Sequence, residues 1–110
     1  SQQEYFEITA GDVPFMEKVY VIRPEKREEI PAVVHNDGTG RIQSVSKETN
    51  ALFHDLIRRF GERTGTPVVL NTSFNLNGEA IVCTPEDAVK TFNSSGMDVL
   101  IMGGLMVRKP

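Results

Sequence analysis

The sequence predicts an α/β domain in which a mixed, twisted sheet is covered by helices. Residues 15–23 form the first expected strand, and their apolar side chains fall on both faces, which is typical of a strand covered on both sides. A long segment near the middle of the chain shows the spacing of apolar residues that marks an amphipathic helix. Strands and helices are expected to alternate along the chain, and this alternation favours a mixed α/β sheet.

Short elements are expected in the first half of the chain. Pro24 fits the first turn of a short polar helix, and Pro31 ends it because proline cannot donate a backbone hydrogen bond. A loop is expected over residues 35–41, which contain Asp37-Gly38. The elements expected here are, in order, a strand over 15–23, a helix over 25–29, and strands over 32–34 and 41–45.

The amphipathic helix is predicted to follow Ser46, a good N-cap, and to run up to Gly65. Its apolar face is expected to consist of Leu52, Phe53, Leu56, Ile57 and Phe60. Three arginines occupy other positions of this helix, where a solvated charged face is the commoner role and a phosphate-binding patch is the alternative. They are Arg58, Arg59 and Arg63.

Four strands and a helix are expected in the second half of the chain. Thr84 is predicted to be the N-cap of the helix, with Pro85 at the first helical position and an acid at the third. Gly96 is expected to supply a left-handed cap at the other end. The inward-facing side chains of the helix are expected to be Ala88, Val89 and Phe92. The strands are expected over residues 67–70, 79–83, 99–102 and 105–108, the last two broken at Gly103-Gly104.

The composition is typical of a soluble globular protein. The chain of 110 residues is enough for one small domain or a part of one, with 39% hydrophobic and 25% charged residues. The formal net charge of -3 gives no overall basic surface, so a main role in binding a nucleic-acid backbone is disfavoured. The apolar runs are far shorter than the roughly 20 residues needed to cross a bilayer, so no membrane association is expected and the cytoplasm is the default location.

The cysteine and the two histidines do not suggest a metal site. A single cysteine excludes an internal disulfide, and Cys83 lies in the apolar stretch 80–83, where a buried small side chain is commoner than a nucleophile. His35 and His54 do not have metal-ligand spacing with Cys83 or with each other. No metal ligands are therefore predicted in this chain.

A cluster of short polar side chains follows the apolar run at 67–70. Its members can donate hydrogen bonds to an anion or a planar polar group, which favours a ligand-binding loop at a strand end. The same residue types are also ordinary turn formers, so a plain turn closed by Asn77-Gly78 is the alternative. The members of this polar cluster are Asn71, Thr72, Ser73 and Asn75.

Arg41 is predicted to open the strand over 41–45. A charged residue at a strand end is usually solvated, unless it shares a cleft with the loop at Asn71. The preceding Gly38-Thr39-Gly40 is a weak dinucleotide-binding signal, because the third glycine is missing and a strand is expected where that motif needs a helix.

Four segments of the chain carry motifs in a recognisable order, namely 23–27, 30–45, 65–75 and 78–88. Two of the motifs are short and specific: Arg-x-Gln-x-Val over 41–45 and Asn-Thr-Ser-Phe-Asn over 71–75. An ordered set of motifs is far more specific than any one of them. Together they cover nearly the whole chain, and the chain resembles the C-terminal domain of the nodulation-type O-carbamoyltransferases.

The resemblance implies both a fold and a reaction. The corresponding domain of that family is similar to the threonylcarbamoyl-adenylate synthases, which bind ATP on a twisted α/β sheet, and residues 72–78 resemble a Ser-Ala-Asn-x-Ser-Gly loop of those synthases. The implied reaction converts carbamoyl phosphate and ATP, with Mg²⁺, to carbamoyl-adenylate and releases pyrophosphate. A separate N-terminal transferase domain with an iron-type metal site would pass the carbamoyl group to a hydroxyl of an antibiotic, sugar or lipo-oligosaccharide acceptor.

The same resemblance implies roles for individual residues. Arg41 matches the arginine of the first motif and Ser73 matches the serine of the second, and both are predicted to be catalytic. A guanidinium offers fixed donors to the charge that spreads over the phosphate oxygens when carbamate attacks the α-phosphate. His35 is either a phosphate ligand or a structural loop residue. The residues predicted to position the carbamoyl group and the nucleotide are Asn71, Thr72 and Asn75.

The chain also departs from the pattern of the family. Two segments that supply basic residues upstream in the family, Phe-Gly-Pro-Arg-Ala-Leu-Gly and Lys-x-Arg-Glu-x-Phe-Arg-Pro, do not occur in residues 1–110. We therefore expect this chain to be the C-terminal part of the carbamoyltransferase C-terminal domain, inactive by itself and able to form a homodimer through an exposed sheet edge. The rival hypotheses are a non-catalytic nucleotide-sensing or interaction module with this fold, and a plain α/β domain with polar turns.

Overall fold

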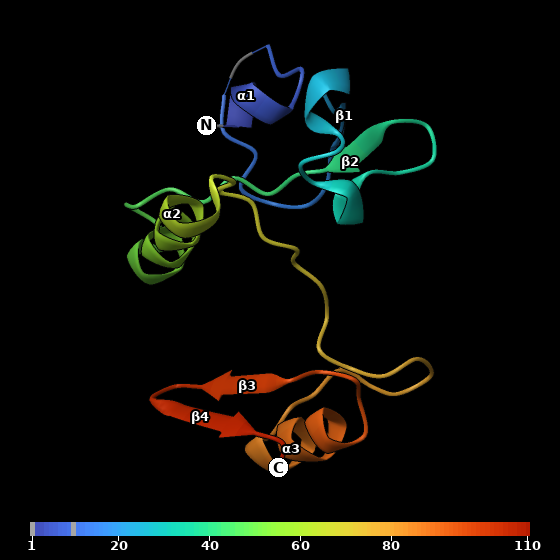
Figure 1. Ribbon diagram of the computed structural model, residues 1–110, viewed down its shortest axis with the longest axis vertical. Helices are drawn as coiled ribbons and strands as arrows, with labels where there is room; N and C mark the ends of the chain where they lie inside the picture. Colours follow the sequence, from blue (N-terminus) through green and yellow to red (C-terminus); the bar gives the residue numbers. More distant parts are fainter. Residues whose placement is uncertain (1, 10) are drawn as a thin grey trace. The chain divides into compact units, whose positions relative to one another are not determined.

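The computed structural model describes residues 2–9 and 11–110, and the chain divides into two compact units, Ser1–Leu70 and Asn71–Pro110 (Figure 1). The predicted mixture of helices and strands is confirmed. The first unit contains α1 (Gln2–Tyr5), β1 (Val19–Val21), the 3₁₀ helices η1 (Pro24–Lys26) and η2 (Pro31–Val33), β2 (Thr39–Arg41) and α2 (Ala51–Thr64). The second unit contains α3 (Pro85–Asn93), β3 (Val99–Met102) and β4 (Leu105–Arg108).

The strands of the described residues form two separate two-stranded antiparallel sheets, β1 with β2 and β3 with β4. These residues therefore do not form the single mixed sheet that the sequence predicts. The difference arises at residues 67–70 and 79–83, which were expected to be strands but have no strand assignment. An apolar run becomes a strand only when another strand completes its ladder of hydrogen bonds, and these two runs lack that partner in the described structure.

The core of the first unit forms around Ile22, which is fully buried. The backbone N–H of Ile22 donates to the carbonyl oxygen of Gly38 at 3.0 Å, and Ile22 forms an isolated antiparallel bridge with Phe6. Gly40 packs so closely on this side chain that an added Cβ would lie 2.7 Å from Ile22 Cδ1. The other buried members of this core are Tyr5, Phe6, Ile8, Val13, Ile30 and Ile42.

Strand β1 is shorter and more exposed than the sequence predicts. It spans three residues, and Val19 and Val21 remain 54% and 40% exposed. The expectation of a strand covered on both sides is therefore wrong for this segment. Arg41 also ends strand β2, where it was expected to open a strand over 41–45. After Arg41 the chain turns to a different partner, because the N–H of Ser44 donates to the Val13 carbonyl and the N–H of Val13 donates to Ser44 Oγ.

The segment between β1 and β2 consists of two 3₁₀ turns. Pro24 does begin a helical turn, as predicted, but the turn ends at Lys26. The predicted strand over 32–34 is wrong. Pro31 occupies the first position of η2, where its fixed φ favours a helical turn, and the N–H of Val34 donates to the Pro31 carbonyl at 3.3 Å.

Helix α2 begins later than predicted, because its N-cap is Asn50 and not Ser46. Asn50 Oδ1 accepts the backbone N–H of Phe53 at 3.1 Å. Ser46 caps the preceding turn instead, where its hydroxyl accepts the N–H of Thr49 at 3.2 Å. The helix ends at Gly65, whose φ of 84° is the left-handed conformation that glycine adopts most readily. One apolar stripe of α2 remains exposed and consists of Leu52, Leu56 and Phe60.

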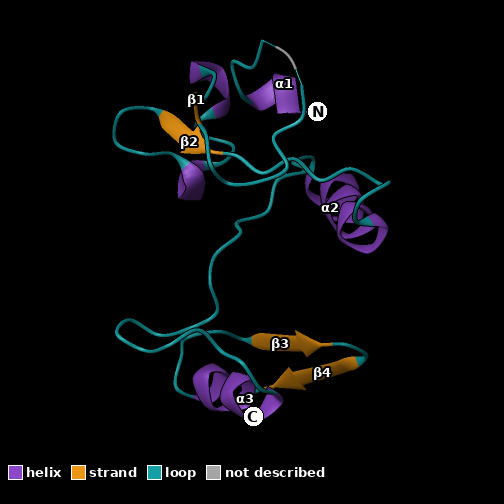
Figure 2. Cartoon of the chain, turned by 180° about the vertical axis from the view of Figure 1, so that it is seen from behind, coloured by secondary structure: helices purple, strands orange, loops and turns teal. Residues whose placement is uncertain are grey.

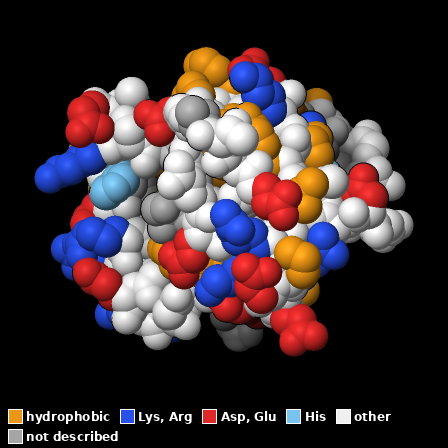
Figure 3. Space-filling model, turned by 90° about the horizontal axis from the view of Figure 1, so that it is seen from above, with side chains coloured by type: hydrophobic (Ala, Val, Ile, Leu, Met, Phe, Trp, Pro, Cys, Tyr) orange, Lys and Arg blue, Asp and Glu red, His pale blue; other side chains and the backbone are white. Residues whose placement is uncertain are grey.

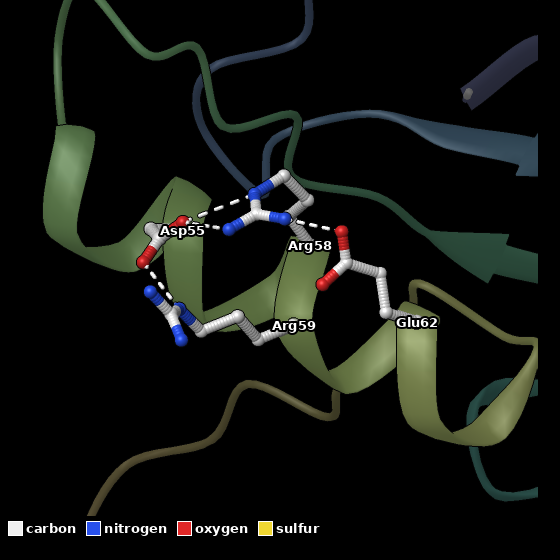
Figure 4. A network of polar contacts seen from close by, with 4 residues as sticks. All are labelled: Asp55, Arg58, Arg59 and Glu62. Carbon is white, nitrogen blue, oxygen red and sulfur yellow. Dashed lines mark hydrogen bonds and ion pairs between the residues drawn. The ribbon is translucent and has the colours of Figure 1, made fainter.

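The polar side of α2 is a solvated network of ion pairs (Figure 4). Asp55 receives hydrogen bonds from Arg58 and Arg59, with nitrogen–oxygen distances of 2.6 and 2.7 Å, and Arg58 also pairs with Glu62. These four side chains are between 42% and 69% exposed. The prediction of a solvated charged face is confirmed for Arg58 and Arg59, which neutralise acids of their own helix.

This network predicts how the stability of the chain changes in acid. The hydrogen bonds from Arg59 and then Arg58 hold the pKa of Asp55 below its usual 3.8. Because the folded-state pKa is depressed, the stabilisation is present above the unfolded-state pKa and is lost as the pH falls through the folded-state value. Asp55→Asn should lower the free energy of urea unfolding at about pH 6 and have little effect at about pH 2.

Asp98→Asn is the matched control for this measurement. Asp98 is exposed and takes part in no hydrogen bond or ion pair among residues 2–9 and 11–110. Its substitution should therefore change the stability little at either pH. An Asp55→Asn effect that is equal at both pH values would contradict the role given to the ion pairs of α2.

Helix α3 packs on the β3–β4 hairpin in the second unit (Figure 2). Both strands and the break at Gly103-Gly104 are as predicted. Gly103 has a φ of 56°, which a two-residue hairpin turn requires. Ala88, Phe92 and Leu100 are buried between helix and hairpin, so the predicted inward face of α3 is confirmed for Ala88 and Phe92. The partly buried side chains packed on them are Phe74, Val82, Val89, Met102 and Val107.

Two local predictions for this unit are wrong. Helix α3 ends at Asn93 with Ser94 as a right-handed C-cap at φ -87°, so Gly96 does not supply a left-handed cap. The N–H of Ser94 donates to the Lys90 carbonyl, which satisfies the helix end without a glycine. Cys83, expected to be buried, is exposed because residues 79–83 do not join a sheet.

The capping box predicted at the start of α3 is confirmed, and its loss should be measurable. Thr84 Oγ1 accepts the N–H of Asp87 at 3.1 Å, and the Asp87 carboxylate accepts the N–H of Thr84 at 3.2 Å. Thr84→Ala should lower the free energy of urea unfolding by about 1 kcal/mol, because a helix N–H loses its partner. Thr84→Ser keeps the hydroxyl and should be nearly neutral. Equal losses in the two variants would contradict this role of the hydroxyl.

Candidate functional site

The exposed face of the β1–β2 sheet carries the first predicted site residue. Val19 pairs with Arg41 and Val21 pairs with Thr39 in the antiparallel register. Because side chains alternate between the faces of a sheet, these four residues share one face. On the opposite face Gly40 is buried and Tyr20 is partly buried. Arg41 therefore lies at the end of β2 on a face that combines apolar and polar side chains and is open to solvent.

The guanidinium of Arg41 is exposed and has no partner among the described residues. It takes part in no hydrogen bond or ion pair within the part of the chain that the structure describes, residues 2–9 and 11–110. A guanidinium presents a planar fork of N–H donors that matches phosphate or carboxylate oxygens. Arg41 thus has the chemistry to bind an anion without first breaking an internal ion pair.

His35 lies in the tight loop that leads into β2. The N–H of His35 donates to the Thr39 carbonyl and its own carbonyl accepts the N–H of Gly38, both at 2.8 Å. The loop is completed by Asp37, whose Oδ1 accepts the Thr39 hydroxyl at 2.6 Å and the Thr39 N–H at 3.0 Å. These hydrogen bonds, the hydroxyl first, hold the pKa of Asp37 below its usual range. His35 Nδ1 lies 3.0 Å from Thr39 Oγ1, so the ring is fixed by the same loop.

Arg27 is a second cationic candidate, which the sequence reasoning missed. Its Nε donates to the Ile22 carbonyl at 3.1 Å, and its guanidinium packs on the loop so closely that a Cβ added at Gly38 would lie 2.5 Å from Arg27 Cζ. Gly38 has a φ of 81°, so this contact and the turn both require glycine. The family resemblance of segment 23–27 is the sequence signal that points to Arg27.

The polar cluster of the second unit is organised by Asn75. Asn75 Nδ2 donates to the carbonyl oxygens of Leu76 and Glu79, both at 3.1 Å, and Asn75 Oδ1 accepts the hydroxyl of Ser73 at 2.6 Å. The side-chain amide of Asn75 therefore closes the turn that contains Gly78, whose φ is 83°. For Asn75 the geometry agrees with the turn-forming interpretation. Ser73 remains exposed, and its hydroxyl retains acceptor capacity.

The predicted site residues fall into two groups. His35 and Arg41 belong to the first unit. His35 precedes Thr39 by four residues, and Arg41 follows Thr39 by two. The remaining four belong to the second unit, where Asn71, Thr72 and Ser73 are exposed and Asn75 is partly buried. Asp37 and Thr39, which position His35, were not predicted from the sequence; the Asp-Gly-Thr tripeptide is the signal for such a turn.

A small open depression in the first unit contains part of the Arg-x-Gln-x-Val motif. Its volume is about 180 Å³, which is below the range of roughly 300–1,000 Å³ usual for small-molecule sites. Gln43 and Val45 line it, together with Pro14, Phe15, Ser44, Thr49, Asn50 and Phe53. The motif thus places Arg41 on the sheet face and its next two members beside this depression.

The surface and the described side chains give three further observations. Basic and acidic side chains are interspersed on the face drawn in Figure 3, in keeping with 12 basic and 15 acidic residues in the sequence. Within residues 2–9 and 11–110, no group of three or more His, Cys, Asp and Glu side chains is arranged to hold a metal ion. The described helices include none that is both long and apolar enough to span a membrane.

A comparison with protein families decides the relationship of this chain. A family model described as carbamoyltransferase C-terminus matches residues 1–109. The chain belongs to the carbamoyltransferase C-terminus family. The resemblance found from the ordered motifs is thereby confirmed for nearly the whole chain.

Individual relatives support this carbamoyltransferase C-terminus assignment. The chain is 44% identical over 108 residues to nodulation protein NolO of Bradyrhizobium diazoefficiens and 43% identical over 108 residues to nodulation protein NolNO of Sinorhizobium fredii. It is 33% identical over 90 residues to the 3'-hydroxymethylcephem-O-carbamoyltransferase of Amycolatopsis lactamdurans. The matches cover 96%, 96% and 82% of this chain, but 20%, 16% and 17% of the respective relatives. The chain thus spans a fifth or less of their length.

Proposed function

We propose that this chain forms carbamoyl-adenylate from ATP and carbamoyl phosphate as part of an O-carbamoyltransferase. The family match over residues 1–109 is the observation that carries the proposal. The name of the A. lactamdurans relative, an O-carbamoyltransferase, supports the transfer of a carbamoyl group to oxygen. The acceptor would be a hydroxyl compound bound by an N-terminal transferase domain, which would also hold the iron-type metal.

The proposed reaction proceeds in two balanced steps. Water first cleaves carbamoyl phosphate to carbamate and inorganic phosphate. A carbamate oxygen then attacks the α-phosphorus of ATP, the bond from that phosphorus to the β-phosphate oxygen breaks, and pyrophosphate leaves. Mg²⁺ enters with ATP and is bound mainly by phosphate oxygens, as is usual for this ion.

Arg41 is the residue that we propose to stabilise the second step. Negative charge spreads over the α-phosphate oxygens as the carbamate oxygen approaches, and a guanidinium can donate to two of them. An Arg41 side chain that is exposed and has no partner among residues 2–9 and 11–110 can do this without losing another interaction. Electrostatic stabilisation of this type is commonly the largest contribution that an enzyme makes to such a reaction.

Ser73 has a smaller proposed role, as a single donor to a phosphate oxygen. Its hydroxyl donates to Asn75 Oδ1 at 2.6 Å, and its hydrogen must turn away from Asn75 by rotation about the Cβ–Oγ bond to donate to a ligand. Ser73→Ala should reduce kcat/KM for pyrophosphate release by roughly 5–150-fold, the equivalent of roughly 1–3 kcal/mol for a hydrogen bond to a charged group. Ser94→Ala, which removes an exposed hydroxyl after α3, should leave kcat/KM unchanged. Equal effects of the two substitutions on kcat/KM would contradict a role for Ser73 in the site.

A chimeric enzyme tests the proposed function. The chimera is the A. lactamdurans O-carbamoyltransferase in which this chain replaces the matched C-terminal-family residues. Pyrophosphate release is measured with ATP, Mg²⁺ and carbamoyl phosphate, and again with each substrate omitted. The proposal predicts release that requires both substrates, and the unmodified parent enzyme is measured alongside as the reference. A folded chimera that transfers carbamoyl groups without releasing pyrophosphate would contradict it.

A further inference from the structure

A chain of hydrogen bonds orders the protons around His35. The Thr39 hydroxyl lies 2.6 Å from Asp37 Oδ1 and 3.0 Å from His35 Nδ1. A threonine hydroxyl has a single hydrogen, and it goes to the carboxylate because a charged acceptor forms the stronger bond. Thr39 Oγ1 must then accept from the imidazole, so His35 Nδ1 carries the hydrogen.

The position of that hydrogen fixes the chemistry of the other ring nitrogen. A neutral imidazole carries one N–H, so in the neutral form of the His35 ring Nε2 is bare and acts as a hydrogen-bond acceptor. A bare nitrogen repels the oxygens of a phosphate, which are acceptors too, and it attracts an N–H group of a ligand. The ring is exposed, so a ligand on the outside of the loop can reach it.

The register of β2 places Thr39, whose hydroxyl contacts the His35 ring, on the same face as Arg41. Thr39, which holds the ring, is two residues from Arg41, and alternate residues of a strand share a face at a spacing of about 7 Å. Under the proposed function Arg41 binds a phosphate group. In both carbamoyl phosphate and carbamoyl-adenylate, the carbamoyl carbon is joined to phosphorus through one oxygen, so its amide is the N–H donor nearest to that phosphate.

We propose that His35 is a specificity-determining residue whose Nε2 accepts a hydrogen bond from the amide N–H of the carbamoyl group. This inference rests on the proposed function and goes beyond it, since it assigns recognition of the carbamoyl amide to Nε2 of His35. Asp37 and Thr39 are positioning residues, because they act through His35. The result is discrimination between a carbamoyl group and an acyl group that lacks the N–H, such as acetyl.

The first arm of the test determines the tautomer in the 110-residue chain itself. Long-range ¹H–¹⁵N spectra distinguish a protonated from a bare ring nitrogen, and the spectra are recorded at a pH where the His35 ring is seen to be neutral. The expected result is a protonated Nδ1 and a bare Nε2. Thr39→Val removes the acceptor and should shift the ring toward the opposite tautomer, while His54 in the same spectra serves as the internal control.

The second arm titrates the chain with carbamoyl phosphate and with acetyl phosphate, in which a methyl group replaces the amino group. Carbamoyl phosphate should shift the backbone amide of Arg41 and the Nε2 resonance of His35 with one saturation curve. Acetyl phosphate should bind about tenfold more weakly, as expected for one lost hydrogen bond, and leave Nε2 unchanged. His35→Phe should abolish the difference between the two ligands, and His35→Gln, which keeps an acceptor, should restore part of it.

Each contrary outcome has a separate meaning. A protonated Nε2 in the unmodified chain overturns the inference directly. Equal affinities for the two phosphates, with saturable shifts at Arg41 and an unchanged Nε2, overturn the inference and leave the proposed function standing. The absence of any shift at Arg41 with carbamoyl phosphate, in the presence and absence of Mg²⁺ and ATP, both in this chain and in the chimera that supplies the upstream basic segments, overturns both.

Discussion

Replacing Arg41 with alanine should nearly abolish carbamoyl-adenylate formation in the chimera while leaving the fold intact. The guanidinium is exposed at the end of β2, and within residues 2–9 and 11–110 it stabilises no other group, so its loss should cost little stability. Loss of a donor that stabilises transition-state charge typically reduces kcat by roughly 10²–10³-fold. Pyrophosphate release and urea unfolding, measured on the same variant, separate the two effects.

Arg108→Ala provides a closely matched control. Arg108 ends strand β4 and pairs with Val99, just as Arg41 ends strand β2 and pairs with Val19, and both arginines are exposed. The two substitutions remove the same side chain from the same kind of strand end. Unchanged turnover in Arg41→Ala, or an equal loss in Arg108→Ala, would remove Arg41 from the proposed mechanism.

Replacing Phe92 with alanine should unfold the second unit. Phe92 is fully buried between α3 and the β3–β4 hairpin, and Lys109 Nζ lies 5.0 Å from the centre of its ring. Truncating a buried phenylalanine costs about 3–5 kcal/mol, which is comparable to the whole stability of a small domain. Amide resonances of residues 71–110 should therefore collapse to the narrow range of an unfolded chain in ¹H–¹⁵N spectra.

Phe15→Ala removes the same side chain from an exposed position. Phe15 is 66% exposed, so its truncation should change the free energy of unfolding by no more than about 0.5 kcal/mol. Native-like amide dispersion of residues 71–110 in Phe92→Ala would contradict the account of this core. A large effect of Phe15→Ala would show that the exposed position contributes more than its burial implies.

The parts of the fold that were predicted correctly have short-range causes. The capping box at Thr84 needs residues three positions apart, and the β3–β4 hairpin needs two glycines between two apolar runs. The predicted strands at 67–70 and 79–83 failed for the opposite reason. Their ladders depend on partners that are distant in sequence, and Leu70 and Ile81 remain 62% exposed without them.

The candidate site was predictable to a different degree at each residue. The ordered motifs were enough to single out Arg41, and its guanidinium, exposed and unpaired among the residues that the structure describes, agrees with a ligand-binding role. The motifs could not reveal that the side-chain amide of Asn75 donates to two backbone carbonyl oxygens, since these hydrogen bonds depend on how the turn closes. Arg27 was missed because its contact with Gly38 joins residues that are brought together by folding.

An isotope experiment on the chimera tests the central claim most directly. Carbamoyl phosphate labelled with ¹⁸O at its carbonyl oxygen is supplied with unlabelled ATP and the hydroxymethylcephem acceptor, and the product AMP is analysed by mass spectrometry. Attack of carbamate on the α-phosphorus places a carbamate oxygen in the nucleotide, so the account predicts AMP that contains ¹⁸O. Carbamoylated acceptor formed without labelled AMP would contradict an adenylate intermediate.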